Sequence, residues 1–291
     1  MATTNTNFVP EVYSDLLLMD RDRESAFIAL ADTEYTEKGT SKDIMTQGDR
    51  VHFVSVPKPS VSAYAYTTLS EQEMKDATIE LEINQANYFN VAFNDVKTRQ
   101  SVRSIEPEMM KEGRKELVKT ADQYIGRYTL AECYTTVTQT ALTSANIIST
   151  ISSAATYLYQ NDVPYEEEIS LVVSPAILEK IQMADILFNT DNSSAIAKGA
   201  AGWAGMMKKF INMRVIVSNN VYVSGSVNYC KMLTRKAFAF AEQIAPGSVE
   251  KVRSTTDFKD IIRGLHLYGA KVIKPKEVIS LALTTASETM V

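Results

Sequence analysis

The sequence predicts an α+β fold, because a long strand pattern, a long helix pattern and a compact strand–turn–helix unit follow one another in one chain. Apolar and polar residues alternate over residues 77–95, which indicates a strand with one solvated face. An amphipathic helical pattern follows Pro107, and the apolar run 169–173 leads into a helix start at Ser174. The chain has 291 residues, 45% of them hydrophobic, so it can bury a sizeable core.

The N-terminal part predicts an arm followed by a long hairpin. Two short helices are expected in the arm, one after Pro10 and one over residues 23–30. A β-rich run at 51–56 is the expected partner of the strand at 77–95. The segment between them, 57–76, is too long for a tight turn and is rich in Ser, Thr, Tyr and Ala. We therefore expect an extended, projecting hairpin loop.

The helical pattern after Pro107 is the longest in the chain. Leu117, Ala121 and Ile125 recur at helical spacing with charged residues between them. The helix should make six or seven turns, on the order of 35 Å, which is the length of a structural strut.

The chain after the long helix contains further helix and strand patterns. Helices are predicted at 146–160 and 176–183, strands at 213–217, from 229 onward, at 237–241 and at 278–283, an ambiguous region at 135–144, and a mixed apolar and basic run at 258–268 that Gly269 should break.

Charge and composition exclude several classes of protein. The chain carries 30 Lys and Arg against 35 Asp and Glu, a formal charge of -5, which argues against nucleic-acid binding through a broad basic face. No signal peptide is evident, and no stretch approaches the roughly 20 apolar residues of a membrane span, so we expect a soluble protein without a membrane partner. Cys133 and Cys230 have no CxxC or CxxH neighbour, which predicts neither a zinc knuckle nor a disulfide framework.

No combination of residues predicts catalysis. His52 and His266 lack Cys, Asp or Glu at metal-ligand spacing, and packing in the core or on the surface is the expectation for both. The acidic run 166–168 is typical of a solvated turn, with ion binding as the less favoured alternative. The Gly-containing segment 199–205 does not fit a phosphate-binding loop. We expect no catalytic residue, no metal and no cofactor.

The candidate functional residues lie in the projecting loop and beside the long helix. In the loop, Lys58 and Lys75 flank Tyr64 and Tyr66. Aromatic side chains favour interfaces because they bury a large area at small entropic cost, so we predict an intersubunit contact, with packing on the loop's own domain as the alternative. Arginines near the helix could pair with acidic residues of a neighbouring subunit or, equally, with acids of the same helix. These arginines are Arg103, Arg114 and Arg127.

Several short motifs occur along the chain in a fixed order. They are GDRV at 48–51, YFNVAFNDV at 88–96, QS at 100–101, LVVSP at 171–175, VIVSNN at 215–220 and RGLHLYGAKV at 263–272. Each motif alone is weak. Together, their order and spacing resemble the major capsid proteins of tailed bacteriophages, which have the Hong Kong 97-like fold, and the resemblance spans nearly the whole chain.

The resemblance implies a division of the chain into named parts. The parts are an N-terminal arm (1–47), an extended β-hairpin loop (48–95), a peripheral domain with a spine helix (96–134 and 251–268) and an apical domain (135–250 and 269–291). No long charged helical extension precedes the arm, so the resemblance implies a separate scaffolding protein or a prosegment already removed.

The resemblance also implies a function and partners. Copies of the chain would form hexamers and pentamers of an icosahedral shell in the virion, assembled in the host cytoplasm. The shell would enclose double-stranded DNA without sequence-specific contact, and the partners would be scaffolding, portal and decoration proteins. Two alternatives stay open. One is the shell subunit of an encapsulin-like nanocompartment, which shares the fold, and the other is a soluble enzyme with an α+β domain.

Overall fold

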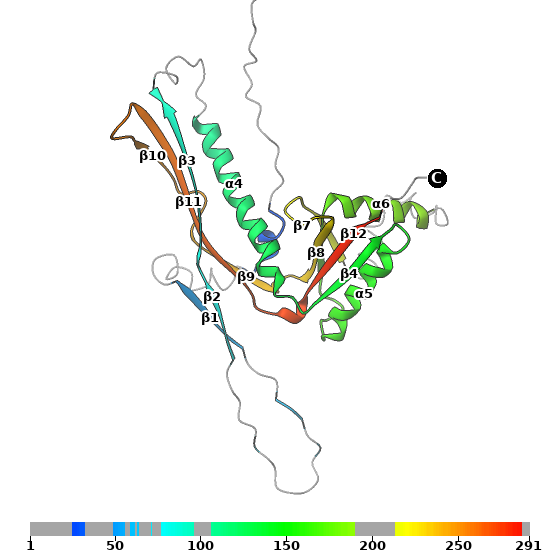
Figure 1. Cartoon of the computed structure of the whole chain (residues 1–291). Helices are drawn as coiled ribbons and strands as arrows, with labels where there is room; N and C mark the ends of the chain where they lie inside the picture. The colour runs from blue at the N-terminus through cyan, green and yellow to red at the C-terminus, as the bar shows by residue number, and fades with distance from the viewer. Residues whose placement is uncertain are drawn as a thin grey trace, which may run out of the picture.

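The computed structural model describes residues 25–32, 49–55, 59–61, 63, 71, 77–95, 106–189 and 213–286. In these parts the chain forms an elongated arm, a compact domain and a two-stranded hairpin that projects from the junction of the two (Figure 1). This arm is made of a helix and a sheet and is distinct from the N-terminal arm predicted for residues 1–47. The helix expected after Pro10 and most of the projecting loop lie outside the described residues. Of the second expected helix, the structure has the short 3-10 turn η2, Ile28–Leu30.

The arm consists of one long helix lying along a four-stranded antiparallel sheet (Figure 1). The helix is α4, Glu106–Arg127, and its 22 residues correspond to about 33 Å, which confirms the predicted long helix. The strands are β3 (Gln85–Asn94), β9 (Phe238–Ile244), β10 (Val249–Arg253) and β11 (Lys259–Val272). Strand β11 is central, because it pairs with each of the other three.

Two glycines allow the sheet to lie close to the helix. Phe89 of β3 points toward α4, and a Cβ atom added to Gly113 of the helix would lie 2.6 Å from its ring. A Cβ atom on Gly264, the residue opposite Phe89 in β11, would lie 2.5 Å from the same ring. The ring therefore fills the space that these two positions leave empty. A side chain at either position would collide with the Phe89 ring, which would have to move.

The strand predicted at 77–95 is two strands, and this part of the prediction is wrong. Strand β2 (Ala77–Glu82) pairs with β1 (Arg50–Ser55), while β3 pairs with β11. The chain changes partner at Ile83, whose N–H donates to the Asp49 carbonyl at 2.9 Å. The apolar alternation continues through the break, because Ile83 stays buried. The predicted pairing of the two hairpin strands is confirmed.

The compact domain contains a six-stranded mixed sheet with the order β4-β12-β8-β5-β6, in which β7 pairs with β8. The helices α5 (Ile147–Gln160) and α6 (Pro175–Asn189) contact each other and β12 (Figure 1). The strands are β4 (Thr135–Leu142), β5 (Ile169–Val173), β6 (Met213–Val217), β7 (Tyr222–Ser224), β8 (Val227–Thr234) and β12 (Val278–Thr285). Two further 3-10 turns are η3 (Thr129–Ala131) and η4 (Pro275–Glu277).

Three sequence expectations change in this part of the fold. The ambiguous region at 135–144 contains the edge strand β4, and α6 continues to Asn189 beyond the predicted end at 183. Gly269 does not break β11, which runs on to Val272. A Cβ atom at Gly269 would lie 2.2 Å from the Glu82 carbonyl oxygen, so the glycine serves a close backbone crossing.

The core has two parts. The larger cluster lies between the six-stranded sheet, its helices and the C-terminal half of α4, and it includes Phe27 from the N-terminal segment. The smaller cluster joins the hairpin to the arm, because Phe53 and Leu81 pack with Ala239 and Ala241 of β9. The arm and the base of the hairpin are thus fixed to one another by buried apolar contacts.

Candidate functional site

The N-terminal segment is clamped at the junction of arm and compact domain by Asp122. The Asp122 carboxylate is fully buried and accepts hydrogen bonds from the backbone N–H groups of Ala26, Phe27 and Ile28, at 3.2, 2.8 and 3.1 Å. The side-chain amide of Asn220 donates to the same carboxylate at 2.9 Å. Hydrogen bonds to a charged acceptor are stronger than neutral ones, so this clamp fixes the backbone firmly.

Packing and strand contacts extend the clamp. The Phe27 ring is buried against Gly126 of α4, where a Cβ atom would lie 2.7 Å from it. Further along, the N–H of Asp32 donates to the Phe238 carbonyl at 2.9 Å, and Asp32 forms a parallel bridge with Ala239 of β9. The chain upstream of residue 25 therefore starts from a fixed point on the subunit.

The hairpin base carries a small network of ion pairs. Arg50 of β1 lies 3.5 Å from Glu80 and 3.1 Å from Glu82 of β2, and His52 lies 3.4 Å from Glu80. These side chains are about half exposed, so the pairs add little stability. They link β1 to β2, both between residues directly opposite in the two strands and diagonally from Arg50 to Glu80. Among the hairpin residues that the structure describes, the large apolar side chains Val54 (68% exposed) and Val61 (96%) face solvent.

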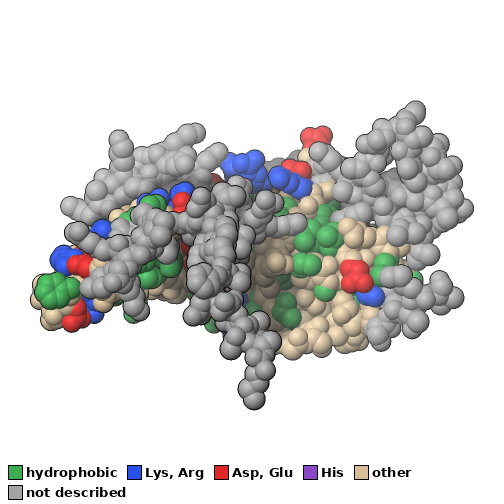
Figure 2. Space-filling view, turned by 90° about the horizontal axis from the view of Figure 1, so that it is seen from above, with side chains coloured by type: hydrophobic (Ala, Val, Ile, Leu, Met, Phe, Trp, Pro, Cys, Tyr) green, Lys and Arg blue, Asp and Glu red, His purple; other side chains and the backbone are tan. Residues whose placement is uncertain are grey.

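Charged side chains also connect the strands at the tip of the arm. The Arg253 guanidinium donates to Asp95 at 2.8 and 2.5 Å and to Asp260 at 2.9 Å. These hydrogen bonds, the one to Asp95 first, raise the pKa of Arg253, and the hydrogen bond from Arg253 is the main cause that lowers the pKa of Asp260. Figure 2 shows basic and acidic side chains beside one another at the left end of the molecule, over this tip. The turn that they support presents Phe258, which is 81% exposed.

The outer face of the four-stranded sheet is partly apolar. Tyr88 of β3 is 75% exposed and lies opposite Leu265 of β11, which is also exposed. An ion pair between Arg263 and Glu250 crosses the same face. Exposed apolar side chains gathered on one sheet face are typical of a surface that another chain covers.

Of the six residues predicted for an intersubunit contact, the structure describes Arg114. Its side chain is exposed on α4, and Nη2 donates to the Gly247 carbonyl at 3.4 Å, which ties the helix to the turn between β9 and β10. Arg127 lies 5.0 Å from the centre of the Tyr128 ring and 4.7 Å from that of Tyr222. Five of the predicted residues lie outside the described part of the chain: Lys58, Tyr64, Tyr66, Lys75 and Arg103.

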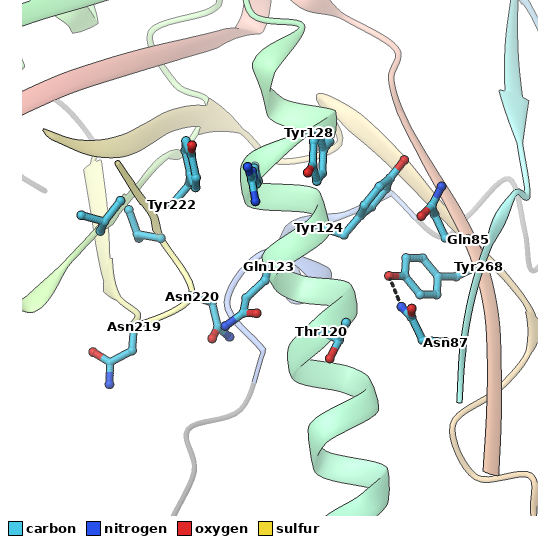
Figure 3. A pocket seen from close by; sticks show the side chains of 13 residues that line it. Gln85, Asn87, Thr120, Gln123, Tyr124, Tyr128, Asn219, Asn220, Tyr222 and Tyr268 are labelled. Carbon is cyan, nitrogen blue, oxygen red and sulfur yellow. Dashed lines mark hydrogen bonds between the residues drawn. The ribbon is translucent and has the colours of Figure 1, made fainter. Parts of the chain in front are cut away.

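A hollow of about 360 Å³ crosses the exposed face of α4, and the sequence patterns did not indicate it (Figure 3). Its lining comes from three regions far apart in the sequence: the C-terminal end of α4 with the adjoining Tyr128 (residues 120–128), the start of β3 with Tyr268 of β11, and the segment 219–223. Tyrosines and side-chain amides dominate the lining. We call this surface the tyrosine–amide groove. No spacing rule could have found it, because only the tertiary fold brings these residues together.

Two buried basic side chains have structural roles. Lys231 of β8 donates to the Leu130 carbonyl at 3.1 Å and to Ser280 Oγ at 2.9 Å, and burial lowers the pKa of its ammonium group. His266 is fully buried, and its Nε2 atom lies 3.1 Å from Glu242 Oε1, which confirms packing in the core for this histidine.

Within the described residues, no group of three or more His, Cys, Asp or Glu could hold a metal ion. No helix in the described part of the chain is long and apolar enough to span a membrane.

The fold of the chain is similar to that of solved phage structures. It matches phage capsid chains over nearly its whole length, which confirms the resemblance seen in the motifs. A chain of Mycobacterium phage Che8 is 26% identical, with a TM-score of 0.76, and the match covers 95% of this chain and 97% of that one. The capsid of cyanophage P-SCSP1u is 15% identical, with a TM-score of 0.73, covering 97% and 94%. The mature capsid of bacteriophage PhiM1 is 13% identical, with a TM-score of 0.70, covering 97% and 93%. No family model and no curated protein sequence matches the chain.

Proposed function

We propose that this chain is the major capsid protein of a tailed bacteriophage with the Hong Kong 97-like fold. Copies assemble into hexamers and pentamers of an icosahedral shell that encloses viral double-stranded DNA. The observation that carries the proposal is the match to phage capsid chains, which covers at least nine-tenths of this chain and of each of theirs. The protein acts as a structural subunit, and no residue is assigned to catalysis.

The shape of the subunit supports this function. The hairpin and the arm project from the compact domain, and both present apolar side chains to solvent, among them Val54, Tyr88 and Phe258 (Figure 1). Such side chains are buried favourably when copies overlap, and many weak repeated contacts give a stable closed assembly. In this proposal α4 is the spine helix and the six-stranded sheet forms the apical domain. Lys58, Tyr64, Tyr66, Lys75, Arg103 and Arg114 remain proposed interface residues.

The partners and location follow from the same proposal. Scaffolding protein guides assembly in the host cytoplasm, portal protein occupies one vertex, and decoration protein binds the finished shell in the virion. The net charge of -5 suits a container for DNA, because a lumen rich in cations would bind the packaged DNA tightly and resist its release.

Sedimentation velocity and negative-stain electron microscopy of the purified chain, with and without scaffolding protein, test the proposal. We expect capsomers or closed shells, and a strictly monomeric chain at high concentration under both conditions would refute it. The nearest alternative is an encapsulin-like nanocompartment. The structures named above are phage capsids, which favours the viral shell. Genes for a portal and a terminase beside this one would support the phage, whereas a gene for an enzyme cargo would support the compartment.

A further inference from the structure

The tyrosine–amide groove has the chemistry of a site for an extended polypeptide. Side-chain amides can donate and accept hydrogen bonds as a peptide group does, and tyrosine rings offer flat apolar surface. Figure 3 shows these side chains around the groove, on α4 in the middle and on both flanks. They are Gln85, Gln123, Asn219, Tyr124, Tyr128 and Tyr222.

The lining is also poor in charge. Arg127 is the one ionised side chain among the lining residues, and its guanidinium already lies over the rings of Tyr128 and Tyr222. A highly charged ligand such as a nucleic acid would find few partners here, because phosphate binding depends on several basic side chains. An uncharged backbone with apolar side chains fits the lining better.

Residues 1–24, which we call the N-terminal tail, join the clamped part of the chain beside this groove. Asn220 lines the groove and donates to Asp122, the carboxylate that holds the backbone of Ala26, Phe27 and Ile28. The clamp therefore fixes Ala26, the second residue of the described chain, within one side chain of the groove lining. A tether of a few residues gives a high effective concentration, so even a weak contact is occupied much of the time.

The composition of the segment suits the site. Residues 8–19, FVPEVYSDLLLM, are mostly apolar, and the charged stretch DRDRE at 20–24 separates them from the clamp. About five extended residues span roughly 17 Å, which lets the charged stretch act as a spacer while the apolar stretch reaches the tyrosines.

We propose that the tyrosine–amide groove binds the apolar stretch 8–19 of the N-terminal tail, residues 1–24, in the same chain. The bound segment covers the exposed face of α4 at the joint between the arm and the compact domain. This contact belongs to the single subunit and does not rest on the proposed shell function, so it is tested on unassembled protein.

Photo-crosslinking of the full chain tests the proposal directly. The crosslinking residue p-benzoylphenylalanine is introduced at Tyr128, which lines the groove, and in a control at Tyr134, which is similarly exposed but does not line it. We expect the probe at position 128 to label residues 8–19, and the probe at 134 not to do so. Labelling of another segment, or the same labelling from both positions, would overturn the proposal.

Mixing isotope-labelled and unlabelled chains identifies the source of the segment. Crosslinks within one isotopic species support the same-chain contact. Mixed crosslinks in the statistical proportion would overturn it in favour of a second copy.

Protection from trypsin gives a second readout that does not depend on crosslinking. Trypsin cleaves after Arg21 and Arg23, next to the part of the segment that we place in the groove. We expect Tyr128→Ala to accelerate this cleavage on the order of tenfold, because the segment then spends more time released, and Tyr134→Ala to leave it unchanged. Circular dichroism checks that both variants are folded. Equal cleavage rates in two folded variants would refute the proposal.

Discussion

Replacement of Asp122 by alanine tests how the N-terminal segment is held. In the native chain its carboxylate accepts three backbone N–H groups and one side-chain amide, and it is fully buried. A buried donor left without a partner costs about 1–3 kcal/mol, so three backbone donors at the lower value give a loss of about 3 kcal/mol. Release of Phe27 from its pocket is the competing outcome, and burial of a phenylalanine is worth a similar amount, about 1.5–3 kcal/mol.

Both outcomes predict a local change with a moderate loss of stability. We expect Asp122→Ala to lower the free energy of unfolding in urea by about 3 kcal/mol. Amide hydrogen exchange at residues 26–28 should become fast, while the amides of β8 and β12 in the six-stranded sheet keep most of their protection. Mass spectrometry of peptic fragments resolves the two regions.

A matched control lies on the same helix. Glu116 is exposed and pairs with Lys119 at 3.1 Å, so Glu116→Ala should change stability by less than about 0.5 kcal/mol. If Asp122→Ala also changes stability by less than about 0.5 kcal/mol, and residues 26–28 stay protected from exchange, then the carboxylate does not hold the segment and the clamp is refuted.

Three further predictions test other parts of the structure. Gly264→Ala should destabilise the chain by about 1–3 kcal/mol, because the added methyl group meets the Phe89 ring. Adding Phe89→Leu to this variant should recover part of the loss. Equal urea midpoints for wild type and Gly264→Ala would contradict the packing. Burial lowers the pKa of Lys231 below that of the unfolded chain, so the unfolded state binds more protons and stability should rise with pH as the lysine loses its proton in the folded state. Urea titrations at pH 7 and pH 9.5 should therefore show a larger gain for wild type than for Lys231→Met, and parallel gains would refute the burial argument. Phe258→Ala should change the stability of the subunit by less than about 0.5 kcal/mol but reduce its assembly, measured by light scattering, and unaltered assembly would remove Phe258 from the proposed interfaces.

Much of the fold could be predicted because local patterns matched the final environment. The alternation along β3 and the helical spacing of Leu117, Ala121 and Ile125 both describe faces that the structure buries in whole or in part. The break at Ile83 could not be predicted in this way. The apolar parity continues through it, and the strand changes partner where β11 crosses closely at Gly269, a contact between residues far apart in the sequence.

The Asp122 clamp could be predicted from the sequence only in part. Asp122 directly follows Ala121, so on a helix it lies about 100° from the apolar stripe, at the edge of the buried face. From the sequence alone, an acidic side chain at that position is predicted to face solvent, because its hydrogen-bond partners are not known. Those partners, the backbone of residues 26–28 and Asn220, are nearly 100 residues away on either side, and no local pattern connects them. The tyrosine–amide groove was missed for the same reason.

A cryo-electron microscopy reconstruction of the assembled protein tests the central claim most directly. The account predicts a closed icosahedral shell in which rings of six and five copies of this chain are joined through the hairpin and the arm. Particles without such rings, or a chain that stays monomeric with scaffolding protein present, would contradict it.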